Sequence, residues 1–302
     1  MAEMNRQVLL VSRPQGAATL DNFKLVETPL APLADGQFRV RNHYLSLDPY
    51  MRGRMNDSKS YAAPQPLNEV MIGGTVGEVV ESKHPSFAAG DKVVGMLGWQ
   101  EYGTSDGKGI AKVDATQVPL SAYLGSVGMP GVTGWYGLKR IIAPQAGNTI
   151  VVSAASGAVG SVVGQLAKFA GCRVVGIAGG ADKCRYVVDS LGFDACVDYK
   201  AGNLHQDLKE ATLCGMIARY DGAAVPLKHP ELILTQRLMI QGFIVSEHMD
   251  VWPQALQELG GLVAQKKLHF RESVAVGLDA APQAFLGMLK GHNFGKQIVK
   301  LI

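Results

Sequence analysis

The chain has 302 residues, of which 47% are hydrophobic and 18% charged, and its formal net charge is +3. This composition is that of a globular protein with a core of its own, and so small a net charge gives no reason to expect binding to nucleic acid or to an anionic membrane. The most apolar window, residues 149–170, is interrupted by serines and glycines. Because no secretory signal or membrane span is visible, we expect a cytoplasmic protein.

The cysteines and histidines of the chain are scattered rather than clustered. Cys172, Cys184, Cys196 and Cys214 form no Cys-x-x-Cys pair, and no His-Glu-x-x-His run occurs. The common zinc motifs have such close spacings, so we predict no metal. Cys172 and Cys196 lie beside or within strand-like runs, where a reduced cysteine packs as a small apolar residue.

The first part of the chain, up to about residue 120, has the pattern of a β-rich domain. Strand-like runs at 37–43, 74–81 and 92–97 are separated by turns such as Ala34-Asp-Gly36 and Ala89-Gly-Asp91. Short strands divided by glycine, proline and aspartate are typical of a small barrel or sandwich.

From about residue 123 the pattern changes to alternating helices and strands. A helix over 123–142 is expected first, with Gly128-Met-Pro-Gly-Val-Thr-Gly134 near its start. The expected strands are 149–152, 173–178 and 195–199, and the expected helices begin after 157 and at 182 and 204. This order indicates an α/β fold, the first half of a doubly wound parallel sheet.

The turn after the first of these strands carries Gly157, Gly160 and Gly164, with Ala154 where a first glycine is usual. Glycines at this spacing allow backbone N–H groups to approach a pyrophosphate at a helix N-terminus. The pattern therefore predicts a dinucleotide site. The alternative is a strand and helix that pack closely through glycine and bind no ligand.

The end of the second strand indicates which dinucleotide is bound. An NAD site places a carboxylate there, whereas this chain has Ala178-Gly-Gly-Ala, followed by Asp182, Lys183 and, slightly later, Arg185. The positive charges favour the 2′-phosphate of NADP, and Asp182 is expected to cap the helix start. Tyr199 is either a further phosphate ligand or an ordinary strand-end aromatic residue.

The second half of the doubly wound pattern is incomplete. After a helix at 204–211, the next run, 213–218, has the character of a later strand, so a fourth strand and a helix are missing near 212/213. The fourth strand lies at the sheet centre, and its loss would leave buried N–H and C=O groups unpaired. We therefore expect that segment to be absent from the printed sequence rather than from the protein; a true deletion is the alternative.

The remaining elements complete the chain. A buried strand is expected at 241–245, an amphipathic helix at 252–266, a last helix at 281–290 and a terminal strand at 297–302. The last elements are expected to return to the first domain.

Several motifs resemble one known family. They are Tyr44-Leu-Ser-Leu-Asp-Pro-Tyr-Met-Arg-Gly-Arg-Met55, the run 128–134, the glycine turn, 174–180, 241–245 and Leu289-Lys-Gly-His-Asn-Phe-Gly-Lys-Gln-Ile-Val-Lys300. With these, nearly the whole chain is similar to zinc-independent medium-chain dehydrogenases/reductases, in the group of NADPH-dependent alkenal/one oxidoreductases. Zinc-binding relatives carry Gly-His-Glu where this chain has Gly73-Gly-Thr75.

This resemblance implies a GroES-like β-rich catalytic domain, 1–122 and 269–302, around a Rossmann domain, 123–268, and usually a homodimer. It implies NADPH (NADP) as cofactor and hydride transfer to the β-carbon of an α,β-unsaturated ketone or aldehyde. The cofactor contacts it implies are Met129, Thr133, Gly157, Ala158, Val159, Gly160, Gly179, Lys183, Tyr199, Cys214, Tyr220, Phe243, Val245 and Asn293.

A metal-free reductase still needs a hydrogen-bond donor for the developing enolate oxygen and a proton for the α-carbon. Tyr50, Tyr61 and Tyr220 are the candidates, each of which is otherwise a packing or surface residue. Arg52 and Arg54 either attract an acidic substrate tail or form structural ion pairs. The alternatives to an enone reductase are a quinone oxidoreductase of the same superfamily and, if the deletion is real, a nucleotide-binding protein without turnover.

Overall fold

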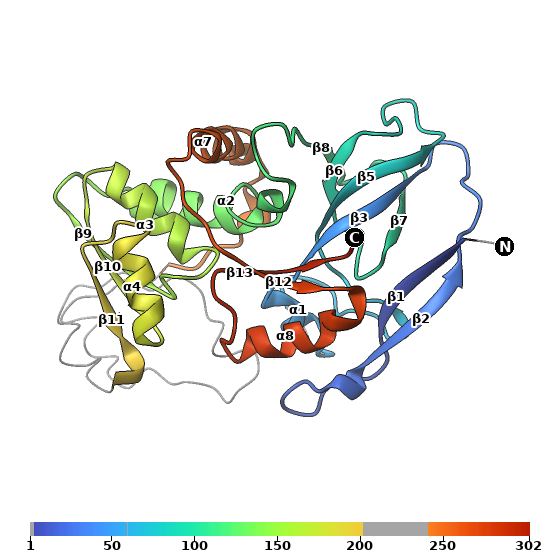
Figure 1. Cartoon of the computed structure of the whole chain (residues 1–302), viewed down its shortest axis with the longest axis horizontal. Helices are drawn as coiled ribbons and strands as arrows, with labels where there is room; N and C mark the ends of the chain where they lie inside the picture. The colour runs from blue at the N-terminus through green and yellow to red at the C-terminus, as the bar shows by residue number, and fades with distance from the viewer. Residues whose placement is uncertain (1–2, 59, 202–240) are drawn as a thin grey trace.

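A computed structural model describes residues 3–58, 60–201 and 241–302. Figure 1 shows a β-rich part on the right and an α/β part on the left, with the C-terminal segment between them. Within the described residues, no helix combines the length and the apolar character that crossing a bilayer would need.

The β-rich part contains two sheets. In the smaller one, β1 (Met4–Leu10) lies between its antiparallel partners β2 (Phe23–Pro29) and β4 (Glu69–Val70). The larger one runs in the order β12-β13-β3-β5-β6-β8, and β7 also pairs with β3. Its strands are β3 (Phe38–Ser46), β5 (Thr75–Ser82), β6 (Lys92–Gly95), β7 (Tyr102–Ser105), β8 (Ala111–Lys112), β12 (Glu272–Val276) and β13 (Lys296–Lys300). A short helix, α1 (Tyr50–Arg54), follows β3.

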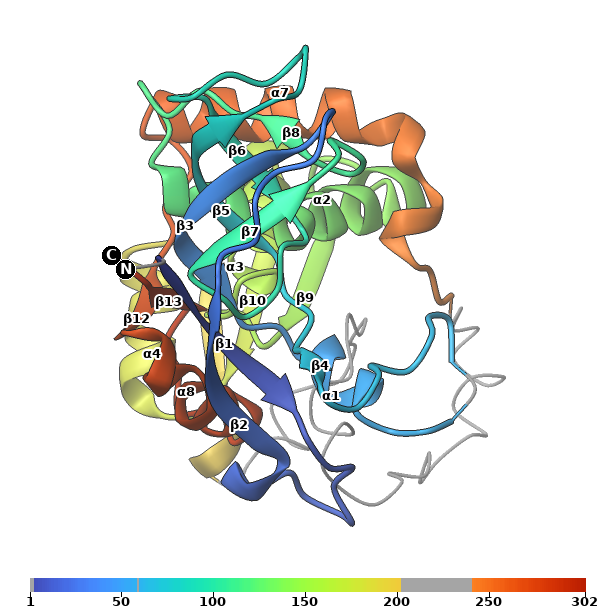
Figure 2. The same cartoon turned by 90° about the vertical axis from the view of Figure 1, so that its right-hand side faces the viewer.

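The C-terminal segment joins this β-rich part. Strand β13 pairs antiparallel with β3, with Ile298 opposite Ser46, and β12 pairs parallel with β13. Helix α8 (Ala281–Leu289) contributes Phe285 to a core shared with Val8 of β1, and Figure 2 shows α8 close to the β1–β2 hairpin. The two ends of the chain therefore build one core, because the apolar face of the last helix packs on the first strand.

The α/β part is built on a parallel sheet in the order β11-β10-β9. The strands are β9 (Thr149–Ser153), β10 (Arg173–Ala178) and β11 (Ala195–Asp198), connected through α3 (Gly160–Phe169) and α4 (Ala181–Asp189). Helices α2 (Met129–Tyr136) and α7 (Trp252–Ala264) belong to the same core as α3. Each parallel pair is joined by a helical crossover, the arrangement of a βαβ unit.

The helix expected over 123–142 is divided. A 3-10 helix, Leu120–Leu124, precedes α2, and a π-helical turn, Gly137–Ile142, follows it. A Cβ on Gly128 would lie 2.1 Å from the Tyr123 carbonyl oxygen, so the chain folds back tightly between the first two pieces. The prediction of one continuous helix was wrong because this close backbone approach interrupts it.

The buried strand expected at 241–245 is also absent. Residues 241–244 have no regular structure, Gln241 is exposed, and a 3-10 turn, Val245–Glu247, follows. A strand needs a hydrogen-bonded neighbour, and among the described residues none pairs with this run. The expected helix at 204–211 and strand at 213–218 lie outside the described residues, so the missing central strand stays a prediction.

Candidate cofactor and active site

The turn after β9 has the shape that the glycine pattern predicts. Ala154 adopts φ +48°, in the left-handed region, and its carbonyl accepts a hydrogen bond from Gly157 N at 2.8 Å. A Cβ on Gly160 would lie 2.4 Å from the same carbonyl oxygen. Only glycine fits at position 160, and Ala154 occupies a conformation that glycine adopts more easily.

This turn leaves backbone donors free at the start of α3. Within the described residues, the amides of Ala158, Val159 and Gly160 donate no hydrogen bond. The N-cap residue of α3, Val159, makes no side-chain cap. Free amides at a helix N-terminus are suited to an anion such as a pyrophosphate.

The third glycine has a different role. A Cβ on Gly164 would lie 1.8 Å from Cζ of Phe193, so α3 packs directly against that ring. The packing alternative stated above therefore describes Gly164, whereas Gly157 and Gly160 shape the turn.

The end of β10 holds the second part of the candidate cofactor site. The Tyr199 hydroxyl lies 2.6 Å from where a Cβ on Gly179 would be, so the two residues are in direct contact. Asp198, the nearby carboxylate, accepts hydrogen bonds from Gly180 N at 2.7 Å and Lys200 N at 3.0 Å. Oδ1 of Asp198 is thus occupied by hydrogen bonds from two nearby backbone amides.

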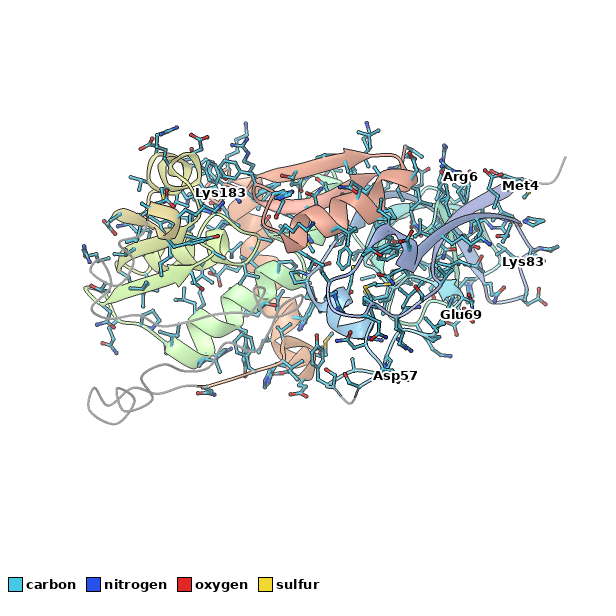
Figure 3. All side chains as sticks on the ribbon, turned by 90° about the horizontal axis from the view of Figure 1, so that it is seen from below. Met4, Arg6, Asp57, Glu69, Lys83 and Lys183 are labelled. Atoms are coloured by element: carbon cyan, nitrogen blue, oxygen red, sulfur yellow. The ribbon has the colours of Figure 1, made fainter. Side chains whose placement is uncertain are left out.

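Lys183 links the two parts of the molecule. Its ammonium group donates to the carbonyls of Gly291, at 2.9 Å, and Asn293, at 2.8 Å, and Figure 3 shows Lys183 where α4 meets the C-terminal segment. Burial, together with the charge of Lys200, lowers the pKa of Lys183. Arg185, in contrast, is exposed and pairs with Asp182.

Asp182 differs from its expected role. Helix α4 begins at Ala181 with Gly180 as N-cap, and no side chain caps it. Asp182 is already inside the first turn, where its carboxylate pairs with Arg185 instead of accepting from the backbone. Its negative charge still suits a helix N-terminus.

The other residues proposed for the cofactor are distributed over α2 and the C-terminal half. The Thr133 hydroxyl donates to the Met129 carbonyl at 2.7 Å, and Phe243 lies against Tyr136 with ring centroids 5.2 Å apart. Val245 is buried. Cys214 and Tyr220 lie outside the described residues.

Two of the candidate catalytic tyrosines, Tyr50 and Tyr61, interact electrostatically. Burial raises the pKa of Tyr50, the Asp48 carboxylate and Tyr61 raise it further, and Arg54 opposes them. Burial also raises the pKa of Tyr61, again opposed by Arg54. Tyr61 is 57% exposed, so the pair has one inner and one outer member.

The two arginines of this motif differ in environment. Arg52 is buried and donates to two neutral oxygens, Asn56 Oδ1 at 2.7 Å and the Gly16 carbonyl, so these bonds hold its guanidinium inside the protein. Arg54 is the one near the tyrosines.

A buried polar cluster near Tyr50 was not found from the sequence. Lys296 Nζ donates to the Leu47 carbonyl and to Asp48 Oδ1, both at 2.8 Å, and Ser46 donates to the other oxygen of Asp48. Burial raises the pKa of nearby Glu272. Asp48 and Lys296 each belong to a motif that carries the family resemblance. Their separation along the chain gave no indication that the two side chains are in contact.

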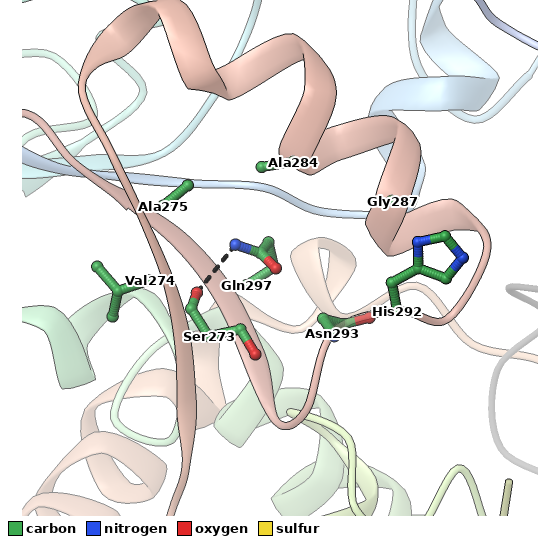
Figure 4. A pocket seen from close by; sticks show the side chains of 8 residues that line it. All are labelled: Ser273, Val274, Ala275, Ala284, Gly287, His292, Asn293 and Gln297. Carbon is green, nitrogen blue, oxygen red and sulfur yellow. Dashed lines mark hydrogen bonds between the residues drawn. The ribbon is translucent and has the colours of Figure 1, made fainter.

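A separate pocket of about 230 Å³ lies between β12, β13 and α8 (Figure 4). Asn293 lines it, and Gln297 crosses it with a hydrogen bond of 2.9 Å to the Ser273 carbonyl. Its volume is below the roughly 300–1,000 Å³ that is usual for sites of drug-sized ligands.

Comparison with known proteins agrees with this geometry. Residues 6–113 match a family described as the N-terminal domain of oxidoreductase, and residues 158–226 match one described as zinc-binding dehydrogenase. The chain is 41% identical to the NADPH-dependent curcumin reductase of Escherichia coli K12, with 99% of this chain and 97% of that protein covered. This chain is a medium-chain dehydrogenase/reductase. The resemblance inferred from the sequence, to the zinc-independent group of this family, is confirmed.

Two further comparisons show which members of the family this medium-chain dehydrogenase/reductase is similar to. It is 38% identical to prostaglandin reductase 1 of Rattus norvegicus over 95% of this chain and 96% of that protein. It matches the crystal structure of CurA from Vibrio vulnificus in complex with NADPH with a TM-score of 0.91, at 40% identity, covering 98% of this chain and 99% of that one. The expected α/β fold is thereby confirmed.

The curcumin reductase alignment spans 337 positions, which exceeds the 302 residues of this chain by 35. At least that many residues of the relative have no counterpart here. No three His, Cys, Asp or Glu side chains gather as metal ligands would in residues 3–58, 60–201 and 241–302; the absence of a metal stays a prediction.

Proposed function

We propose that the chain reduces the carbon–carbon double bond of α,β-unsaturated ketones and aldehydes with NADPH and without a metal ion. The observation that carries the proposal is Lys183, which lies in the first turn of α4, directly after β10, and is held there by the carbonyls of Gly291 and Asn293. The named activities of the curcumin and prostaglandin reductases support the reaction type.

The residues present fit a dinucleotide phosphate. The free amides of Ala158, Val159 and Gly160 suit the pyrophosphate, because a helix N-terminus favours negative charge. Lys183 and the Tyr199 hydroxyl suit a 2′-phosphate, and the missing side chain of Gly179 leaves room for that hydroxyl. The remaining proposed cofactor contacts are Met129, Thr133, Phe243, Val245, Asn293, Cys214 and Tyr220. When bound, NADPH supplies the hydride that the β-carbon of the substrate accepts.

The chain's own residues must then stabilise charge on the substrate oxygen and supply a proton. Burial keeps Tyr50 protonated by raising its pKa, so its hydroxyl can donate to the oxygen on which charge develops. Tyr61, at the surface beside Arg54, is the alternative donor and the residue that could shield the substrate from water. Tyr220 remains the third candidate. In place of the zinc-binding motif of other family members, the chain has Gly73-Gly-Thr75.

The test is consumption of NADPH with a simple conjugated enone, measured beside NADH, beside the matching saturated ketone and beside a quinone. Fast consumption only with NADPH and the enone is expected. Faster turnover of the quinone would instead assign a quinone oxidoreductase. No consumption with any substrate, by protein shown to bind NADPH, would favour a nucleotide-binding protein without turnover.

The proposal also includes a homodimer and a cytoplasmic location. It divides the chain into a catalytic domain, 1–122 with 269–302, and a nucleotide-binding domain, 123–268. The pairing of β13 with β3 supports the return of the C-terminus to the first domain. Light scattering tests the dimer. An intact mass above 32.1 kDa would indicate that the natural protein carries the segment predicted to be missing.

A further inference from the structure

Two cysteines on neighbouring elements meet beside the proposed 2′-phosphate site. Cys184, in α4, and Cys196, in β11, have their sulfur atoms 2.9 Å apart. Cys196 also lies near Gly176, on the side of the sheet that faces Val187 of α4. Neither thiol is fully buried, so small oxidants can reach the pair.

We propose that Cys184 and Cys196 form a reversible disulfide with hydrogen peroxide as oxidant, and that this disulfide weakens the binding of NADPH. The effect on NADPH binding rests on the proposed function, because it takes Lys183 as the ligand of the 2′-phosphate. Lys183 directly precedes Cys184, and Tyr199 follows Cys196 by three residues.

The reaction passes two electrons from the two thiols to one hydrogen peroxide and releases two waters. The Cys184 sulfur attacks the peroxide O–O bond, giving a sulfenic acid and one water. The Cys196 thiol then attacks that sulfur, and its proton leaves with the hydroxyl group as the second water. Burial and the neighbouring Cys184 raise the pKa of Cys196, which makes Cys196 the resolving thiol rather than the first one oxidised.

Bond formation must move one element toward the other. A disulfide shortens the sulfur separation from 2.9 Å to about 2.05 Å. Strand β11 is held by its ladder to β10 from Ala195 to Asp198, whereas α4 has only Val187 buried. We therefore expect α4 to be the element that adjusts, which displaces Lys183 relative to the carbonyls of Gly291 and Asn293 that hold it.

The first test is chemical. The full chain is treated with peroxide, alkylated with iodoacetamide and analysed by intact mass and peptide mapping. Two alkylation sites should be lost and a Cys184–Cys196 linked peptide should appear, both reversed by dithiothreitol. Cys172→Ser, which removes a buried thiol elsewhere, is the matched control and should behave as wild type. Alkylation of both thiols, or a bridge to Cys172 or Cys214, would overturn the proposal.

The second test is binding of NADPH and NADH, followed by fluorescence with no substrate present. Oxidation should weaken NADPH binding about tenfold, the effect of losing one charge-assisted hydrogen bond, and leave NADH unchanged. Cys196→Ser should abolish this response. A bridged protein with unchanged NADPH affinity would overturn the regulatory half. Because neither test measures turnover, their outcome is separable from failure of the proposed reductase activity.

Discussion

Lys296 Nζ lies 2.8 Å from Asp48 Oδ1, although 248 positions separate the two residues in the chain. Both side chains are almost fully buried, at 6% and 8% exposed. The contact joins β13 to the loop that leads into α1, directly before Tyr50. A buried ion pair with satisfied hydrogen bonds defines the geometry of the elements that it joins, although its net contribution to stability is small.

Removing one member of this pair should be costly. Lys296→Met leaves the Asp48 carboxylate buried with the Ser46 hydroxyl as its remaining side-chain partner, and we expect a loss of about 3–5 kcal/mol in unfolding free energy. Urea denaturation measures it. The control is Lys112→Met, which breaks the half-exposed pair with Asp91 and should lower stability far less, because solvent screens an exposed pair. Equal losses in the two variants would refute the importance of burial here.

Lys183→Met should raise the KM for NADPH by roughly 10- to 100-fold, because one charge-assisted hydrogen bond to the 2′-phosphate is lost. The KM for NADH should not change. Arg185→Met is the matched control, since Arg185 is exposed and pairs with Asp182, and it should leave both values near those of wild type. A parallel rise for NADPH and NADH would point to a structural role for Lys183.

Ala154→Gly should stabilise the protein. Ala154 is exposed and has φ +48°, and glycine relieves that strain at an entropic cost, for a net gain of about 0.5–1 kcal/mol. Ala170→Gly, an exposed alanine with φ −81° at the end of α3, is the control and should destabilise. Thermal or urea unfolding compares them; a loss at both positions would contradict the argument.

Tyr50→Phe should lower kcat by about 100-fold or more, the usual effect of losing one hydrogen-bond donor to a developing oxyanion. Tyr61→Phe provides the comparison. Since the pKa of Tyr50 is raised, its hydroxyl stays protonated up to at least about pH 10. The pH–rate profile of the wild type should therefore show no decline from Tyr50 ionisation in the neutral range. A larger loss in Tyr61→Phe would transfer the role to Tyr61.

Asp194 should make stability depend on acid pH. The Lys168 side chain and the Val174 amide lower its pKa, so the unfolded chain takes up this proton first as pH falls. Its contribution is complete above about pH 3.9, the ordinary value, and is lost as pH drops through the lower folded value. Asp194→Asn should thus differ from wild type at neutral pH and converge with it in acid. An Asp194→Asn variant that differs from wild type equally at neutral and at acid pH would contradict this role of Asp194.

The sequence predicted the limits of a strand or helix well where the residues of that element alone determine its structure. The strand expected at 173–178 is β10 with the same limits, and the helix expected at 281–290 is α8 within one residue. In both, apolar residues recur with the period of a strand or of a helix. This pattern is set within the element and depends little on the elements packed against it. The divided helix around Gly128 depended instead on contact with Tyr123.

The sequence by itself determined the glycine turn, the lysine at the end of the second strand and the family motifs, since these chemistries depend on residues close together in the chain. Only the tertiary structure decided that Asp48 meets Lys296, that Cys184 faces Cys196, and that Lys183 reaches the carbonyls of Gly291 and Asn293. Such contacts arise when strands and helices pack, and periodicity along the chain carries no information about which distant side chains that packing brings together.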